Sequence, residues 1–416
     1  MVPGMSASPP GPERVVLHVG LHKTGTTYLQ SLLRQNRQRL ARRHGIYVPP
    51  GLRTTVFASL DLITRHSGMA RDPRTSGAWD RLAVDVNGCG LPTALVSQER
   101  LSVARPRHAR RAVESFPESQ VDVVVTVRDL PRLLVSYWQE AIKNGVTWTL
   151  DEYVTALRDP DSAGVDPARR FWLHEDVTGV LRCWGSAVPA DRLHVVTVPP
   201  AGSAPELLTD RFASVLGLTH HDLPREPRLK NENIGLVGTE LLRRLNERLD
   251  GRLPDVAYDF GVKRPVVQGF ASLPRDRSSV LDDEQRAWAA SVSARFAEEI
   301  GKNGYRVVGD LTDLQPDTSS STPSPTAPTR EVTDAELLDA ALAALTELSI
   351  RHGKVMAERD LETAPETTDL SGWWARVGTH AKSRTFAAQR AAADLAVRTR
   401  LGRRAAASYM RRRAGR

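Results

Sequence analysis

A short polar segment near the start of the chain combines residue types that bind phosphate. Residues 20–27 read Gly-Leu-His-Lys-Thr-Gly-Thr-Thr, with Lys23 between two glycines and hydroxyls at Thr24, Thr26 and Thr27. In the phosphate loop of nucleoside triphosphatases, G-x-x-x-x-G-K-[ST], the lysine follows the second glycine. Here the glycine spacing is kept but the lysine comes three residues earlier, so its ammonium would approach a different oxygen. Residues 20–25 are called the glycine loop below.

The residues flanking the glycine loop predict a strand before it and a helix after it. Residues 15–19 are mostly β-branched and apolar, which is typical of a short buried strand. Apolar residues then recur at helical spacing from Tyr28 to Leu33, and we expect this helix to reach about Arg43. Such an arrangement directs backbone N–H groups and a helix dipole at one point, which suits an anion. The alternative is an ordinary glycine turn with a solvent-facing lysine.

A second candidate phosphate contact follows the strongest strand pattern, residues 121–127. Arg128 ends this strand, Pro131 allows a helix to begin, and Ser136 lies within that helix. A guanidinium offers a planar fork of donors to a phosphate, and a serine hydroxyl adds a further contact. The alternative is a buried arginine paired with Asp129.

Glu99 is the candidate general base. It follows a third apolar run, residues 93–97, and the carboxyl ends of strands in open α/β sheets face the ligand crevice. Glu99 would therefore face the same crevice as Lys23, where a carboxylate can take a proton from an attacking hydroxyl or amine. The alternative is that Glu99 caps the next helix or pairs with Arg100.

Together these stretches resemble the binding motifs of sulfotransferases that use 3′-phosphoadenosine 5′-phosphosulfate (PAPS). Residues 20–27 are similar to the family's 5′-phosphosulfate loop, P-K-[ST]-G-[ST]-[ST]. Residues 128–138 resemble its 3′-phosphate motif, R-[ND]-P-x-x-x-x-x-S-x-[YW], with the proline one position later. The resemblance extends to about residue 312. It implies a P-loop-like α/β fold with a mostly parallel central sheet, as in bacterial members.

The resemblance also implies a reaction, in which a sulfuryl group passes from PAPS to a hydroxyl or amine and 3′-phosphoadenosine 5′-phosphate is released without a metal. Lys23 would meet the oxygen that bridges sulfate and 5′-phosphate. The implied 5′-phosphate contacts are Thr24, Gly25, Thr26 and Thr27, and the implied 3′-phosphate contacts are Arg128 and Ser136. Cytosolic members carry a histidine where this chain has Glu99, and other branches use glutamate.

Two further stretches are candidates for cofactor contact. Family members often close the cofactor site with a basic loop late in the domain, which suggests Lys230 and Asn231, although a solvated turn explains them equally well. Trp172 and Trp184 could stack on an adenine, but aromatic residues at helical spacing are typical of a core.

The remaining pattern predicts the rest of the domain. We expect a short strand after His44, no clear pattern over residues 51–90, one helix over residues 171–185 and a strand over residues 191–198. Further helices are expected over residues 240–249 and 282–300, with a short closing element at residues 305–308.

Composition divides the chain into four parts. We expect a disordered N-terminus at residues 1–13, a sulfotransferase-like domain at 14–312, a Pro/Ser/Thr linker at 313–330 and a helical extension with a basic tail at 331–416. Leu337, Leu338, Ala341, Leu342, Leu345 and Leu348 form one predicted apolar stripe in the extension. The net charge of +8 is uneven, because residues 315–370 carry −7 and residues 371–416 carry +11.

The same composition limits location and partners. No apolar run approaches the length of a membrane helix, and no signal peptide is evident, so the cytoplasm is expected. Two cysteines in no metal-ligand pattern argue against a zinc site. We expect a small-molecule or carbohydrate-type acceptor and no nucleic acid, with contact between the basic tail and a membrane surface or acidic partner left open.

Two other functions fit parts of the sequence. A nucleotide-dependent kinase with an atypical phosphate loop would need magnesium and an acidic ligand after a strand, for which Asp129 is the candidate. A non-catalytic scaffold would keep the fold and act through the charged C-terminal tail.

Overall fold

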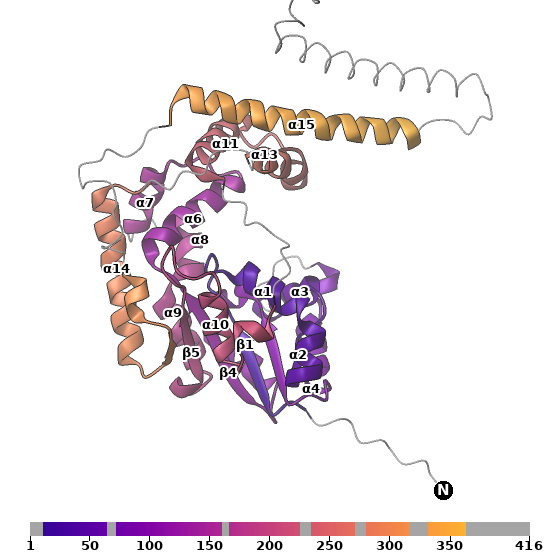
Figure 1. Cartoon of the computed structure of the whole chain (residues 1–416), viewed down its shortest axis with the longest axis vertical. Coiled ribbons are helices and arrows are strands. Elements are labelled where there is room, and N and C mark those ends of the chain that lie inside the picture. The colour runs from indigo at the N-terminus through magenta and orange to yellow at the C-terminus, as the bar shows by residue number, and fades with distance from the viewer. Residues whose placement is uncertain are drawn as a thin grey trace, which may run out of the picture. The chain divides into compact units, whose positions relative to one another are not determined.

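A six-stranded parallel sheet forms the centre of the molecule (Figure 1). The computed structural model describes residues 11–64, 72–159, 166–224, 234–270, 280–315 and 332–362. The strands lie in the order β2-β3-β1-β4-β5-β6. Their bounds are β1 Arg14–His18, β2 Ile46–Tyr47, β3 Thr93–Ser97, β4 Gln120–Val127, β5 Leu193–Thr197 and β6 Arg306–Val308. The α/β fold with a parallel central sheet, predicted from the sequence, is confirmed.

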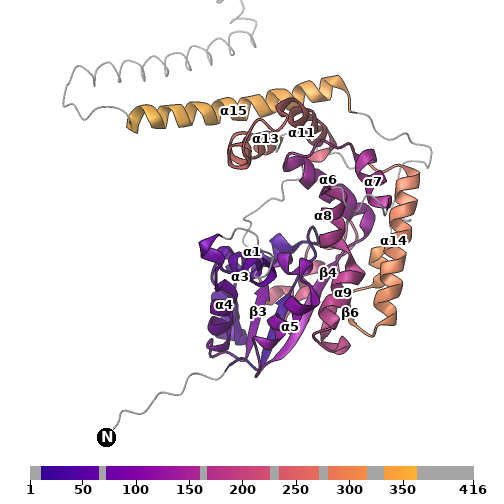
Figure 2. The ribbon, with the colours of Figure 1, turned by 180° about the vertical axis from the view of Figure 1, so that it is seen from behind.

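Helices connect the strands, and several of them cover the two faces of the sheet (Figures 1 and 2). In the first half they are α1 Thr26–Gln35, α2 Arg37–His44, α3 Leu52–Thr64, α4 Ala78–Asn87, α5 Pro106–Glu114, α6 Leu130–Lys143, α7 Leu150–Arg158 and α8 Asp166–Glu175. The others are α9 Val177–Gly185, α10 Leu207–Ser214, α11 Gly235–Leu249, α12 Asp255–Tyr258, α13 Arg264–Gly269, α14 Asp283–Lys302 and α15 Asp334–Glu362. None of these described helices has both the length and the apolar character of a bilayer-spanning segment.

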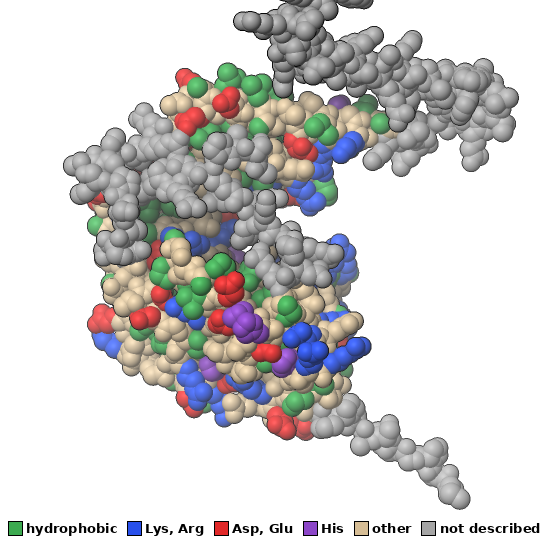
Figure 3. Space-filling view, viewed as in Figure 1, with side chains coloured by type: hydrophobic (Ala, Val, Ile, Leu, Met, Phe, Trp, Pro, Cys, Tyr) green, Lys and Arg blue, Asp and Glu red, His purple; other side chains and the backbone are tan. Residues whose placement is uncertain are grey.

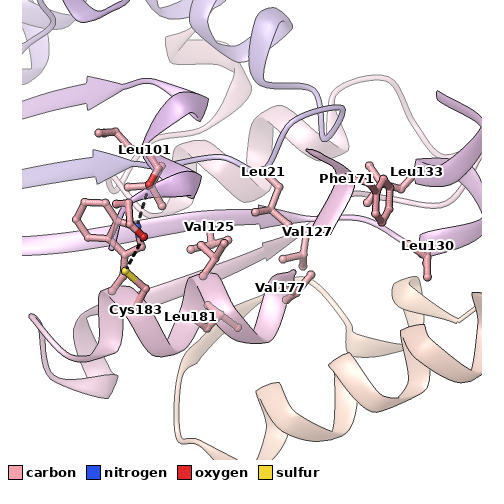
Figure 4. Close-up of a cluster of buried hydrophobic side chains, with 14 of the residues drawn as sticks. Leu21, Leu101, Val125, Val127, Leu130, Leu133, Phe171, Val177, Leu181 and Cys183 are labelled. Carbon is pink, nitrogen blue, oxygen red and sulfur yellow. Dashed lines mark hydrogen bonds between the residues drawn. The ribbon is translucent and has the colours of Figure 1, made fainter. Parts of the chain in front are cut away.

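The two-residue period of the strands produces two apolar clusters, one on each face of the sheet. Val15 and Leu17 of β1 belong to the larger cluster, with helices α4, α5 and α9. Val16 belongs to the smaller cluster, with α1 and α10. Figure 4 shows the larger cluster, where Val125 of β4 lies near Leu181 of α9. Because helices cover both faces of the sheet, the strands are continuous apolar runs, which explains why the sequence predicted them.

Two helices predicted as single are each broken in two. The first ends at Gln35, because the Asn36 side chain donates to Leu32 O at 2.9 Å and to Pro224 O at 3.0 Å. The helix expected over residues 171–185 breaks before Asp176, whose carboxylate accepts from Gly179 N at 3.0 Å and caps α9. The segment expected to lack a pattern, residues 51–90, contains α3 and α4.

The packed region continues past residue 312. Asp313 is buried, and its carboxylate accepts from Arg211 Nη1 and from the Thr197 hydroxyl, both at 2.6 Å. Leu314 belongs to the larger apolar cluster. Predictions for residues 1–10, 316–331 and 363–416 lie outside the described residues.

The predicted apolar stripe of the extension is divided between two faces of α15. By its contacts the chain separates into Met1–Ile350 and Arg351–Arg416, and the first half of α15 belongs to the former. Leu337, Ala340 and Ala344 are buried, and a Cβ added at Gly269 of α13 would lie 2.8 Å from Ala343 O. The small residues therefore allow a close helix contact. Leu338, Leu342 and Leu345 are exposed instead. Figure 3 shows hydrophobic side chains at the surface of α15.

We expect Asp313→Ala to destabilise the domain by roughly 3 kcal/mol, because it leaves the mostly buried Arg211 guanidinium without its carboxylate. The free energy of unfolding, from urea titrations, measures this. Glu298→Ala is the control, because its ion pair with Lys302 is exposed. Equal stability of the two variants would contradict the assigned role of Asp313.

Candidate functional site

The glycine loop places backbone donors at the carboxyl edge of β1. Gly25 has a left-handed φ of 87°, and Lys23 shares this region with a φ of 58°. Helix α1 begins immediately afterwards, and no side chain of the described residues caps it. The first N–H groups of a helix have no partner within the helix. The backbone N–H groups of Thr26 and Thr27 therefore belong to an N-terminus suited to an anion.

Two buried threonines, Thr24 and Thr126, hold the glycine loop in place. Thr24 Oγ1 lies 2.6 Å from both Leu21 O and Thr126 Oγ1, and the Thr126 hydroxyl also donates to Gly20 O at 2.9 Å. Because the Thr24 side chain is fully buried, its hydroxyl holds the loop together. Among the predicted threonines, Thr26 is also buried and Thr27 is exposed.

Lys23 is paired with a carboxylate that the sequence did not single out. Its Nζ donates to Glu140 Oε2 of α6 at 2.8 Å. Lys143 reaches the same oxygen at 2.8 Å, and Lys263 lies 3.6 Å from Oε1. Burial acts to raise the pKa of Glu140, but the charges of Lys23 and Lys143 outweigh it and hold that pKa well below its usual range.

Arg128 joins the second motif to the glycine loop. Its Nη1 donates to the backbone oxygen of Lys23 at 3.2 Å, across 105 residues of sequence. Its Nε is buried and has no hydrogen-bond partner among the described residues. Burial, followed by the nearby Arg132 charge, lowers the pKa of Arg128 to about 10. The expected alternative, a pair with Asp129, is not what forms, because the Asp129 carboxylate bonds Arg132.

Ser136 lies on the side of α6 that faces this cluster. It is half-buried and precedes Glu140 by four residues, and residues four apart share a helix face. Since Glu140 touches Lys23, Ser136 lies one turn earlier on the same side. The structure thus brings Lys23, Arg128 and α6 together.

Glu99 is beside the loop at the end of β3. It begins a short 3-10 helix, η2 Glu99–Val103, and its backbone oxygen would lie 3.2 Å from a Cβ added at Gly20. Its carboxylate accepts a hydrogen bond from the Gln30 amide of α1. The capping role considered from the sequence belongs to Gln98, which accepts from the Arg100 backbone N–H at 3.3 Å.

The other candidates fall outside the site or outside the described residues. Lys230 and Asn231 lie within residues 225–233, which are not described. Trp184 is fully buried and donates to Leu101 O, and Trp172 donates to Leu157 O, so both tryptophans are core residues. Within the described ranges, no group of three His, Cys, Asp or Glu side chains is arranged to hold a metal ion.

Sequence reasoning missed three residues that contact the loop or belong to it: His22, Glu140 and Glu175. The available signal for Glu140 was its position one turn after Ser136 in a helix already assigned to phosphate binding. Nothing in the sequence indicated Glu175, because its place beside His22 depends on tertiary packing.

Comparison with solved structures gives a weak likeness to a sulfotransferase. No protein-family model matches the chain, and no curated protein is significantly similar to it in sequence. The structure is similar to the crystal structure of a sulfotransferase from Alicyclobacillus acidocaldarius, with a TM-score of 0.36 and 15% sequence identity. The match covers 60% of this chain and 98% of that chain. A likeness at this level supports no conclusion about activity.

Glu140→Gln should destabilise the protein at pH 7 and do so less in acid. The folded-state pKa is lowered, so the stabilising contribution is complete above the unfolded-state pKa of about 4.3 and is lost as pH falls below it. Urea titrations of wild type and variant at about pH 7 and about pH 3.5 measure the difference.

The control is Glu298→Gln, whose exposed ion pair contributes little at either pH. A stability difference for Glu140→Gln that stays constant or grows toward acid would contradict the assigned ion-pair cluster.

Proposed function

We propose that this chain is a sulfotransferase that moves a sulfuryl group from PAPS to a hydroxyl or amine. The observation that carries the proposal is the contact between Arg128 and the backbone of Lys23. It joins two candidate phosphate-binding motifs at the carboxyl edge of adjacent strands, where α/β sheets bind ligands. A donor with phosphates at its 5′ and 3′ positions needs two such sites side by side.

The charges at these residues support an anionic donor. Arg128 has a buried Nε without a hydrogen-bond partner in the part of the chain that the structure describes, and a buried donor left unsatisfied is unfavourable. A 3′-phosphate would supply the missing acceptor, with Ser136 as a further contact. The uncapped N-terminus of α1 offers N–H donors for the 5′-phosphate near Gly25, Thr26 and Thr27. These residues fit the proposed donor.

In the proposed reaction, the acceptor oxygen or nitrogen bonds to sulfur as the bond from sulfur to the bridging oxygen breaks. The protein's task is to position the partners and stabilise charge, as in phosphoryl transfer. Lys23 would leave Glu140 and stabilise the negative charge that grows on the bridging oxygen. Glu99 would take the proton released by the acceptor.

The two alternatives have less support. For a magnesium-dependent kinase, the candidate ligand Asp129 is already engaged, since it caps α6 and bonds Arg132. A scaffold acting through the basic tail depends on residues 371–416, which are not described.

We expect 3′-phosphoadenosine 5′-phosphate to bind at micromolar concentration with excess chelator present, and the double variant Lys23→Ala/Arg128→Ala to lose this binding. Isothermal titration calorimetry measures it, beside ATP with magnesium. The matched control is Lys302→Ala/Arg286→Ala, which removes the same charges from α14. Magnesium-dependent ATP binding without bisphosphate binding would support the kinase and exclude the donor site.

Lys23→Ala alone should reduce the transfer rate about a hundredfold or more, because it removes a donor from the developing negative charge. The measurement is transfer of radiolabelled sulfate from PAPS to the best member of a panel of alcohol and amine acceptors. Lys302→Ala should retain the wild-type rate, since its ammonium is exposed and pairs with Glu298. A normal rate in Lys23→Ala would contradict the leaving-group role.

A further inference from the structure

A further carboxyl group, that of Glu175, is fully buried next to the glycine loop. Glu175 is the last residue of α8, and its side chain has no exposed surface. The next residue, Asp176, caps α9. The Glu175 Oε1 atom lies 3.6 Å from His22 Nδ1, and His22 directly precedes Lys23 in the loop.

The surroundings of Glu175 leave several polar atoms unsatisfied. Both Glu175 oxygens, His22 Nδ1, His174 Nδ1 and the Tyr153 hydroxyl are buried without a hydrogen-bond partner among the described residues. The His22 ring packs edge-on against His174, with centroids 4.5 Å apart. The loop therefore lies next to buried polar side chains, and these atoms form no hydrogen bonds with one another.

The interactions that compensate the burial of Glu175 are weaker than the effect of the burial itself. Burial raises its pKa well above the usual range, and the opposing effects of the Lys23 charge and the His22 backbone N–H do not cancel this. Burial therefore favours the protonated, uncharged form of Glu175 more than is usual for a glutamate. An unpartnered polar group in a core is unfavourable, and an apolar side chain of similar size would be more stable there.

We propose that Glu175 is a positioning residue, which holds His22 from behind and thereby fixes the glycine loop that presents Lys23. The side chain reaches His22, the loop residue directly before Lys23, from a helix outside both phosphate-binding motifs. In this proposal, Glu175 lowers the stability of the fold but maintains the geometry of the site. The catalytic consequence rests on the proposed donor site, whereas the effect on the loop does not.

The test compares Glu175→Leu with Glu175→Gln in the full chain. Glu175→Leu should raise the urea midpoint, because it removes the unpartnered acid. It should also speed amide hydrogen exchange at residues 22–25 and weaken 3′-phosphoadenosine 5′-phosphate binding, each about tenfold, equivalent to about 1.4 kcal/mol. Glu175→Gln, which is neutral and keeps the shape and polar atoms, should match wild type in exchange and affinity.

Asp313→Leu is the control, because it replaces a buried acid that has partners. It should lower the urea midpoint and leave loop exchange and bisphosphate affinity unchanged. The proposal is overturned if Glu175→Leu keeps wild-type loop exchange, if it is less stable than wild type, or if Glu175→Gln fails to restore the loop. Failure of the wild type to bind the bisphosphate would remove the donor site, while the exchange measurement would still decide the role of Glu175.

Discussion

The parallel pairing of β1 with β4 fixes the position of the glycine loop relative to Arg128. The pairing continues beyond the end of β1, where Leu21 N donates to Thr126 O at 2.9 Å and Thr126 N donates to Gly20 O at 2.6 Å. The glycine loop is therefore tied to β4 two residues before Arg128. A guanidinium and a set of backbone donors, distant in sequence, are held together by main-chain hydrogen bonds. The main-chain hydrogen bonds therefore fix the distance between the glycine loop and the start of the Arg128 side chain.

The electrostatics of the site depend on a balance of several charges. Lys23 and Arg128 bring positive charge to the edge of the sheet, and Glu140 compensates Lys23 while contacting two other lysines. Arg128 has a backbone oxygen as its described hydrogen-bond partner. An anionic ligand would thus compete with Glu140 for Lys23. It would also supply a hydrogen-bond acceptor for the Nε of Arg128. The two phosphate sites differ in what a ligand must displace.

The sequence predicted the strands and the loop well, because their signals are local. Buried parallel strands read as apolar runs, and the spacing from Gly20 to Gly25 marks a turn before a helix. The breaks in the helices were missed because they depend on side-chain hydrogen bonds made by Asn36 and Asp176. Helical periodicity continues through such positions.

The candidate site could be predicted only where a motif names its residues. Lys23, Arg128 and Glu99 could be placed at one edge of the sheet because each follows the carboxyl end of a predicted strand. Their partners could not, because Glu140 and Glu175 reach the loop from helices whose packing no local pattern specifies. The roles of the motif residues in catalysis remain proposals.

The most direct test of the donor site is a crystal structure of the protein with 3′-phosphoadenosine 5′-phosphate. We predict the 5′-phosphate within hydrogen-bond distance of the glycine loop and the N-terminus of α1. The 3′-phosphate should contact Arg128 and Ser136, with Lys23 released from Glu140. A nucleotide bound elsewhere, or a 3′-phosphate distant from Arg128, would contradict the account.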